Sequence, residues 1–359
     1  MVRRVGKYAV ATGLASMLLS AGVQAQGSVT LFGIADVGVA YTSKTLNLAT
    51  GGNGGHAFQM LDSGMGVTQF GIKGIEDLGG GMKVKFELAS AFNLGNGGVG
   101  ISNGNTFGNQ AWLALAGNFG EVKAGLQFSP FFTTLVALDP RQTIYASGGM
   151  PMADAVGATG IFNSNAISYT SPEIAGLRGS MMVALGGEAG NFQAGRQYSA
   201  SLSYRAGGLL VGGAYYNGNS GGTVVTKIPS TVAFIGKIVG ASYSYKNLTM
   251  NATFENYHVA GSFNNYVYGG GFNYLIFPDL EINGGAWWTA DQNNSKNHSV
   301  LAALGGEYFL SKRTSWYAQV GRVDNHGAMN TGLCLCSLNT LYGAQGQTIG
   351  VNVGINHKF

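Results

Sequence analysis

The carboxy-terminal segment, residues 347–359, alternates between two kinds of side chain. Its odd positions from Ile349 to Phe359 are apolar or aromatic apart from one histidine, whereas its even positions from Thr348 to Lys358 are polar or glycine. A period of two predicts a β-strand with one apolar and one wet face. Sustained over this length, the pattern is typical of a barrel strand that contacts lipid outside and a water-filled lumen inside.

Residues 1–25 are expected to form a cleaved signal peptide. Arg3, Arg4 and Lys7 give a basic start, residues 8–19 are mostly apolar, and Val23 and Ala25 are small residues at the positions that a signal peptidase reads. The apolar stretch is shorter than the roughly 20 residues of a spanning helix, so a signal peptide is favoured over an anchor. We therefore expect an exported protein, with residues 26–359 forming one outer-membrane barrel domain.

Composition excludes several classes of protein. Three of the 20 basic residues and none of the 16 acidic ones lie in residues 1–25, which leaves a net charge near +1 on the remainder. Nucleic-acid binding is therefore not expected, because it needs clustered positive charge. Only 10% of the chain is charged and 60 residues are glycine, yet no later stretch approaches 18 consecutive apolar residues. A closed barrel fits both facts, because its strands need apolar residues only at alternate positions.

Turn signals set the number of strands. Seven short turns are predicted at 76–81, 118–120, 171–176, 205–208, 246–247, 277–279 and 311–313. With an opening strand at 29–41 and a closing one at 348–359, they predict an all-β fold, a 16-stranded antiparallel transmembrane β-barrel; 18 strands is the nearest alternative. Alternation alone would also fit a soluble β-sandwich, but the signal peptide and the terminal Phe359 favour the barrel.

Five short strings carry a family resemblance. They are GSVTLFG at 27–33, GIEDLGGG at 74–81, QAW at 110–112 before FG at 119–120, SKRT at 311–314 and GINHKF at 354–359. In this order and spacing, the chain resembles the general porins of beta-proteobacterial (Burkholderia and Neisseria type) outer membranes. The resemblance implies a homotrimer of 16-stranded barrels whose third external loop folds inward and narrows a channel for small hydrophilic solutes.

The third external loop is expected at residues 128–165, a connection of 38 residues. A connection this long without regular structure is usually functional. It carries Asp139, Asp154 and a single basic residue, Arg141. The resemblance favours an inward constriction over a solvated external loop.

Side-chain parity predicts the pore wall. On three predicted strands the lysines alternate with apolar residues that face lipid, so the lysines face the lumen, where they would raise the local anion concentration. A lysine on the lipid face at the midplane would cost about 2–4 kcal/mol. The candidate constriction and selectivity residues are Lys73, Lys83, Lys85, Lys123, Asp36, Asp139, Arg141 and Asp154. We expect the loop aspartates to oppose the lysines and Asp36 to offset part of their charge; the alternative is a set of hydrated rim residues.

The chain departs from the family pattern at two positions. Leu126 stands where the pattern of the fifth strand usually has arginine, and Asn109 stands where a basic residue is common. Fewer guanidinium groups argue against strong anion selectivity. The sequence therefore predicts a modest anion preference.

Aromatic residues near the predicted strand ends are interpreted as an interfacial girdle. They are Tyr243, Tyr245, Tyr257, Tyr274, Trp288, Tyr308, Trp316 and Phe359. A row of lumen-facing rings would instead indicate a sugar-stacking path. Trp112 and Trp287 are the candidates for such a path, and two rings do not make one.

Two cysteines, Cys334 and Cys336, lie in the last long connection. Export permits a disulfide, although a bridge across one residue closes a very tight ring, so free thiols remain an alternative. A metal site would need more ligands at suitable spacing, and the nearest histidine is His326, eight residues before Cys334. We expect no metal site and no cofactor.

The sequence carries no catalytic motif. Neither His-Glu-x-x-His nor Gly-x-Ser-x-Gly spacing occurs, and glycine-rich strings such as 51–55 and 95–100 precede no predicted helix. We expect a passive outer-membrane diffusion channel and not an enzyme, with outer-membrane lipid, lipopolysaccharide and small solutes as its contacts. Two alternatives are a barrel-type hydrolase, for which His357 would need a paired serine, and a surface-binding barrel.

Overall fold

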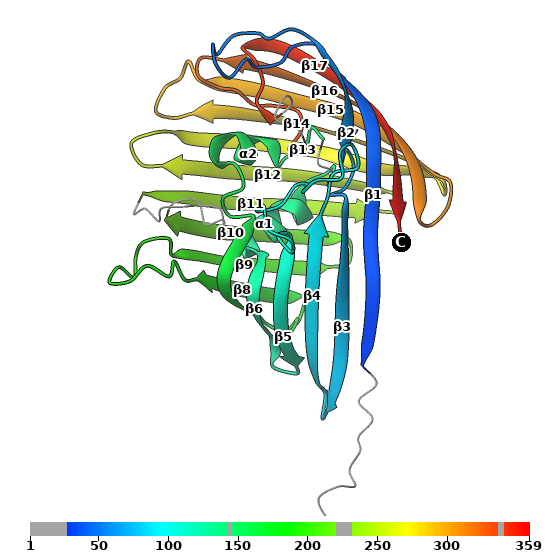
Figure 1. Ribbon diagram of the computed structural model, residues 1–359, viewed down its shortest axis with the longest axis vertical. Coiled ribbons are helices and arrows are strands. Elements are labelled where there is room, and N and C mark those ends of the chain that lie inside the picture. Colours follow the sequence, from blue (N-terminus) through cyan, green and yellow to red (C-terminus); the bar gives the residue numbers. More distant parts are fainter. Residues whose placement is uncertain (1–26, 143–144, 220–231, 337–340) are drawn as a thin grey trace, which may run out of the picture.

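The computed structural model describes residues 27–142, 145–219, 232–336 and 341–359 and gathers their strands into one antiparallel sheet that closes on itself (Figure 1). The strands are β1 (Ser28–Thr42), β2 (Ala57–Asp62), β3 (Gln69–Gly79), β4 (Met82–Ala91), β5 (Gln110–Gly117), β6 (Gly120–Phe128), β7 (Phe162–Thr170), β8 (Leu177–Ala184), β9 (Gln197–Ala206), β10 (Leu209–Asn219), β11 (Ala233–Tyr245), β12 (Leu248–Val259), β13 (Asn264–Phe277), β14 (Leu280–Asp291), β15 (His298–Phe309), β16 (Thr314–His326) and β17 (Gly346–Lys358). The helices are α1 (Pro130–Leu138) and α2 (Met150–Val156). Neither helix in the described ranges is long and apolar enough to cross a membrane.

The seventeen labelled strands make sixteen wall positions, because β2 and β3 share one. The upper half of β1 pairs with β2 and its lower half with β3, so these two segments form a single crossing interrupted at residues 63–68. The other edge of β1 pairs with β17, from Ile34 opposite Lys358 to Thr42 opposite Gly350. This pairing closes the barrel, and the predicted 16-stranded antiparallel barrel is confirmed.

Short and long connections alternate around the barrel. All seven predicted turns join consecutive strands at one end, and the long connections lie at the other. At the first turn, Gly79, Gly80 and Gly81 all have positive φ, a conformation that glycine adopts without strain. The long segment after β6, here named L3, comprises residues 129–161. It is shorter than predicted because β7 begins at Phe162 rather than near residue 166.

The early start of β7 has a local cause. The pairing of β6 with β7 shifts register between Gly125 and Gln127, and Asn165 has a φ of 53° within the strand. Such an irregularity breaks the strict alternation from which the strand start was predicted. The first residues of β7 therefore carry no visible period of two.

The two faces of the wall have opposite character. Outward positions of β1, β5, β16 and β17 leave large apolar side chains exposed, among them Val39, Leu113, Val320, Val351 and Val353. Most inward positions of the same strands are polar or small, with Phe32, Trp112 and Val323 among the exceptions. Seven of the eight predicted girdle aromatics are exposed, but Tyr257 is fully buried, so its assignment to the girdle was wrong. It lies at an inward position of β12, where its hydroxyl donates to Glu255.

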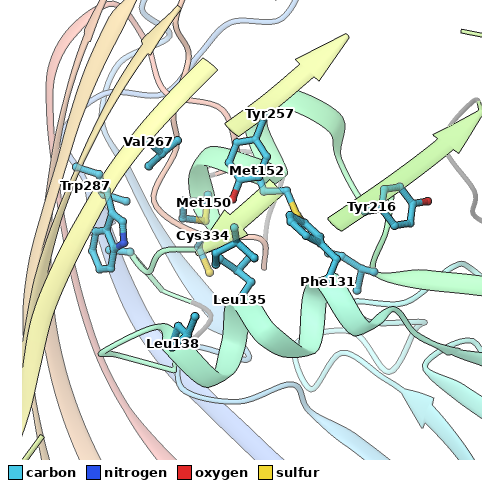
Figure 2. Packing of buried hydrophobic residues seen from close by; sticks show 14 of the residues in the cluster. Phe131, Leu135, Leu138, Met150, Met152, Tyr216, Tyr257, Val267, Trp287 and Cys334 are labelled. Carbon is cyan, nitrogen blue, oxygen red and sulfur yellow. The ribbon is translucent and has the colours of Figure 1, made fainter. Parts of the chain in front are cut away.

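L3 lies inside the barrel and is anchored by apolar packing (Figure 2). Phe131, Leu135 and Leu138 of α1 are almost fully buried and belong to one cluster with Tyr216 and Tyr257 of the wall. The first turn of the helix is fixed locally, since the Ser129 side chain accepts a hydrogen bond from the backbone N–H of Phe132. The inward-folded third loop predicted from the resemblance is thus present.

Glycines on the inner wall make room for this docking. A Cβ atom at Gly236 would lie 2.8 Å from the ring of Phe131, and one at Gly240 would lie 3.1 Å from Leu138. The first distance is shorter than real Cβ contacts and the second is unusually tight, so a side chain at either position would require Phe131 or Leu138 to shift. The sequence of β11 is therefore matched to the helix that it carries.

The last long connection, residues 327–345 and here named L8, covers L3. Cys334 and Cys336 are joined by a disulfide, and Cys334 pairs with Tyr145 of L3 through an isolated β-bridge. The backbone N–H of Ala146 also donates to the carbonyl of Leu333. L8 and L3 thus form one layered plug against the barrel wall.

Candidate functional site

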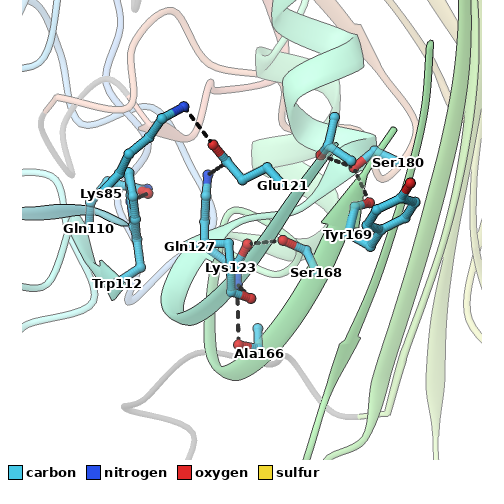
Figure 3. A network of polar contacts seen from close by, with 11 residues as sticks. Lys85, Gln110, Trp112, Glu121, Lys123, Gln127, Ala166, Ser168, Tyr169 and Ser180 are labelled. Carbon is cyan, nitrogen blue, oxygen red and sulfur yellow. Dashed lines mark hydrogen bonds and ion pairs between the residues drawn. The ribbon is translucent and has the colours of Figure 1, made fainter. Parts of the chain in front are cut away.

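A cluster of charged side chains lines the inner wall at the turn end of β3–β6 (Figure 3). The Lys85 ammonium lies 3.0 Å from one carboxylate oxygen of Glu121, and the Lys123 ammonium lies 3.7 Å from the other. Lys123 also sits 4.3 Å above the ring of Trp112. One glutamate therefore lies between two lysines from different strands.

Strand register explains how these residues meet. Ala114 of β5 lies between Lys85 of β4 and Lys123 of β6 in one cross-strand row. The methyl side chain of Ala114 leaves the space above it free, so longer side chains reach across β5. Glu121 stands in the next row beside Ala116, which is equally small.

The remaining two predicted lysines belong to the same patch. Lys73 of β3 lies directly across from Glu87 of β4, and its ammonium is 4.9 Å from the Phe32 ring. Lys83 lies opposite Asp77, next to the turn. The structure thus brings together all four lysines, and it adds acidic neighbours that the sequence analysis did not include.

An acidic pair lies on the far side of the lumen. Glu281 of β14 and Glu307 of β15 are direct cross-strand partners at the same turn end of the barrel. Following the strand order, β14 is eight positions from β6 in a wall of sixteen, which is halfway around. The basic patch and the acidic pair therefore face each other across the turn-side mouth.

Asp36, predicted at the pore wall, is fully buried in the gap between β2 and β3. Its carboxylate accepts hydrogen bonds from the backbone N–H groups of Gly64, Met65 and Gly66 at 3.0–3.1 Å. It also accepts from the Tyr317 hydroxyl at 2.7 Å. Charge-assisted bonds of this kind are about twice as strong as neutral ones. Asp36 therefore holds the interruption in the wall, and its carboxylate oxygens are already hydrogen-bonded by neutral donors.

Asp139 and Arg141 lie just after α1 and are nearly buried. The Asp139 carboxylate accepts from the backbone N–H groups of Arg141 and Gly148. The Arg141 guanidinium donates to Asn283 of β14 at 2.8 Å and to Gln319 of β16. These bonds tie L3 to the wall on the side of the acidic pair.

Burial shifts the titration of both groups. It raises the pKa of Asp139, an effect that the two backbone donors and Arg141 oppose. It lowers the pKa of Arg141 to about 10, an effect that Asp139 opposes. Arg141 is therefore charged at neutral pH, and its guanidinium is hydrogen-bonded to other groups of the protein.

Asp154 lies in α2 at the contact with L8. Its Oδ1 accepts from the backbone N–H of Gly332 at 3.2 Å, and its Oδ2 is buried without a hydrogen-bond partner among the described residues. Burial raises the pKa of Asp154 well above its ordinary value. No ion pair in the described residues joins Asp139 or Asp154 to the four lysines. The part that these loop residues play in selectivity stays a prediction.

A hollow of about 250 Å³ lies between L3 and the opposite wall. The free face of α1 contributes Phe132 and Val136, the latter 41% exposed, and the interruption of the second crossing contributes Met65 and Val67. Asn109 lies at its edge. The hollow beside L3 thus has a mostly apolar lining that includes Asp139, and the four lysines lie nearer the turn end.

Functional residues that the sequence analysis missed are the inward acids and two inward arginines. The missed side chains are Asp77, Glu87, Glu121, Glu281, Glu307, Arg178 and Arg205. Parity would have found Glu87 and Glu121, because they alternate with the same apolar residues as the lysines. Arg205 was assigned to the predicted turn at 205–208, where side-chain alternation does not predict which face of the wall a residue occupies.

Comparisons with known proteins agree with this geometry. The family model described as Gram-negative porin matches residues 10–328. The chain belongs to the Gram-negative porin family. This porin is 29% identical to outer membrane porin protein 32 of Delftia acidovorans, over 96% of the chain and 98% of the relative. It is 27% identical to major outer membrane protein P.IB of Neisseria meningitidis serogroup B, over 86% and 91% of the two chains.

Solved structures give the same result. The porin superposes on the anion-selective porin from Comamonas acidovorans with a TM-score of 0.78, at 25% identity over 93% of this chain and 100% of the other. The trimer form of OmpT from Vibrio cholerae gives a TM-score of 0.67 at 12% identity, over 93% and 99%, which supports the fold alone. Its relatives are channels, so the porin is not an enzyme. His357, considered for a hydrolase, has its Nδ1 2.9 Å from the Thr314 hydroxyl.

Proposed function

We propose that this porin is a passive diffusion channel for small hydrophilic solutes and ions with a modest preference for anions. The observation that carries the proposal is the arc of inward cationic side chains on β3–β9. Four lysines and two arginines stand on it, against Asp77, Glu87 and Glu121 as the nearest inward acids. A surplus of positive charge in a water-filled mouth raises the local concentration of anions.

The anion preference is modest because much of this charge is compensated. Glu121 is paired with two of the lysines, and Glu281 and Glu307 lie across the lumen. Exposed pairs of this kind are worth about 0.2–1 kcal/mol and leave a partial field. The similar Comamonas protein, which is described as anion-selective, supports the sign of the preference.

The proposal is tested by reversal potentials of purified protein in planar lipid bilayers under a tenfold KCl gradient. We expect a chloride-to-potassium permeability ratio above 1 and of the order of a few. A ratio below 1 would refute the anion preference, and absence of conductance steps from folded protein would refute the channel itself.

We also propose a homotrimer in the bacterial outer membrane, reached after cleavage of a signal peptide. The trimer form described for the similarly folded OmpT and the exposed apolar outer face support this assembly in a lipid environment. Residues 1–26 lie outside the described residues, so export stays a prediction from sequence. The mass of the mature protein and of the unheated detergent complex tests both points, with a monomeric complex counting against the trimer.

A further inference from the structure

A polar hollow of about 280 Å³ lies on the turn side of α1 against β8–β10. Arg178 of β8 and Arg205 of β9 line it. Arg178 pairs with Ser203 across the strands, and Arg205 follows Ser203 by two residues on the same face. The two arginines are therefore diagonal cross-strand neighbours, a spacing that long side chains bridge.

Both guanidinium groups are available to a ligand. Neither forms an ion pair or a side-chain hydrogen bond within the described parts of the chain, and both residues are exposed. Lys85 and Lys123 differ, because they already share Glu121. A guanidinium presents a planar fork of donors that matches a carboxylate or phosphate, so two of them make a directional anion site.

Hydroxyl groups complete the lining. Thr133 and Thr134 of α1 donate to the carbonyl of Pro130 at 3.1 and 2.8 Å, and Ser180 of β8 donates to the carbonyl of Tyr169 at 3.2 Å. A hydroxyl whose hydrogen is committed in this way still has lone pairs that accept. The hollow therefore offers acceptors beside two cationic donors, a combination suited to a ligand with several hydroxyl groups and one anionic end.

The fold keeps this space open. Gly212 of β10 lies across from Ser203, and a Cβ atom there would lie 3.7 Å from both Thr134 and Leu138 of α1. A second polar hollow of about 440 Å³ shares Arg205 and continues past Ser242 and Thr249. A ligand longer than a simple inorganic anion therefore has room along the wall.

We propose that this hollow is a transit subsite for polyhydroxylated organic anions, that is, sugar acids or sugar phosphates. The arginines hold the anionic group and the threonine and serine oxygens accept from the ligand hydroxyls. The inference rests on the proposed channel function. Its affinity is low, with a dissociation constant on the order of millimolar, because a conducting site must also release its solute.

The test uses full-length protein in planar bilayers with KCl as the current carrier. Added D-gluconate and glucose 6-phosphate are compared with hexanoate, which has a carboxylate and six carbons but no hydroxyl groups, and with glucose, which has no charge. We expect concentration-dependent current interruptions from gluconate or glucose 6-phosphate, with binding at least about fivefold tighter than for hexanoate or glucose. The tighter of the two sugar ligands identifies the anionic head group that the site prefers.

Two variants separate recognition from net charge. Arg178→Gln with Arg205→Gln should weaken gluconate binding at least fivefold, whereas the charge-matched pair Lys83→Gln with Lys123→Gln should weaken it less than twofold. Thr134→Val, nearly isosteric, should weaken gluconate binding but leave hexanoate binding unchanged. Equal binding of gluconate and hexanoate, or equal losses from the arginine and lysine variants, would overturn the subsite. A wild-type protein without any conductance would instead overturn the channel function.

Discussion

Glu121 offers the most direct test of the electrostatics of this porin. Its carboxylate lies within 3.0 Å of Lys85 and 3.7 Å of Lys123, so the change Glu121→Gln removes one negative charge and leaves both ammonium groups unpaired. The lysines stay on the wall, and the side chain keeps its size. We expect the preference for anions to increase.

The size of the effect follows from Coulomb's law. For an ion about 8 Å from the removed charge, the unscreened energy in water is about 0.5 kcal/mol. At 0.1 M salt, with a screening length of about 10 Å, this falls to about 0.2 kcal/mol. Anions then gain roughly 1.5-fold in local concentration and cations lose as much, so the permeability ratio rises about twofold. At 0.01 M salt, where the screening length is about 30 Å, the same reasoning gives about fourfold.

The assay is the reversal potential in planar bilayers under tenfold KCl gradients at low and high mean salt. Glu76→Gln is a matched control, because Glu76 lies on β3 beside the same patch but pairs with Val84 at an outward position. We expect little change in the ratio from it. An unchanged ratio in Glu121→Gln, a shift toward potassium, or a shift that does not depend on salt would refute the reasoning.

Three further perturbations address the architecture. Asp36→Ala removes the acceptor of three backbone donors and of the Tyr317 and Asn356 side chains, so we expect a loss of at least about 3 kcal/mol in unfolding free energy by urea titration, with Asp36→Asn intermediate; equal stability of all three would contradict it. Burial raises the pKa of Asp154, so the neutral carboxyl stabilises the buried contact between α2 and L8, and this stability is lost as pH rises from about 4 through the folded pKa; Asp154→Asn should remove that pH dependence of L3 proteolysis, and an unchanged dependence would exclude the carboxyl. Gly236→Val should displace Phe131 and make single-channel currents smaller or noisier than those of the wild type. Variant currents as large and as quiet as those of the wild type would show that α1 tolerates the side chain.

The barrel could be predicted because its signals are local. A period of two in the sequence distinguishes the two faces of each strand. Runs of glycine mark turns such as Gly79–Gly81, where the structure has positive φ, so strands and turns can both be predicted from short stretches of sequence. The predicted start of β7 was wrong because a register shift and the left-handed conformation of Asn165 interrupt the period of two there. Local rules describe regular strands and fail where a bulge intervenes.

The site could be predicted only in part, because its charges are defined by register across several strands. Parity placed Lys85 and Lys123 on the inner face, but their shared contact with Glu121 depends on the row that passes through Ala114. Nothing in the sequence of β4 alone gives that row. The same holds for Asp36, whose backbone donors lie 28–30 residues away in a gap of the wall that the strand pattern does not predict.

The position of L3 follows from a conflict that every such barrel must resolve. A lumen that carries water needs a polar wall, whereas a loop held inside it needs apolar contacts to offset the entropy of its ordering. This chain separates the two demands around the circumference. Tyr216 and Tyr257, together with the glycines of β11, receive α1 on one side, and Trp287 lies close to Gly148 of L3. The hollow beside Met65 and Val67 then lies on the opposite side, and the lysine patch belongs to that same half of the wall. The helix docked on one side thus leaves the lysine patch beside the part of the lumen that α1 does not fill.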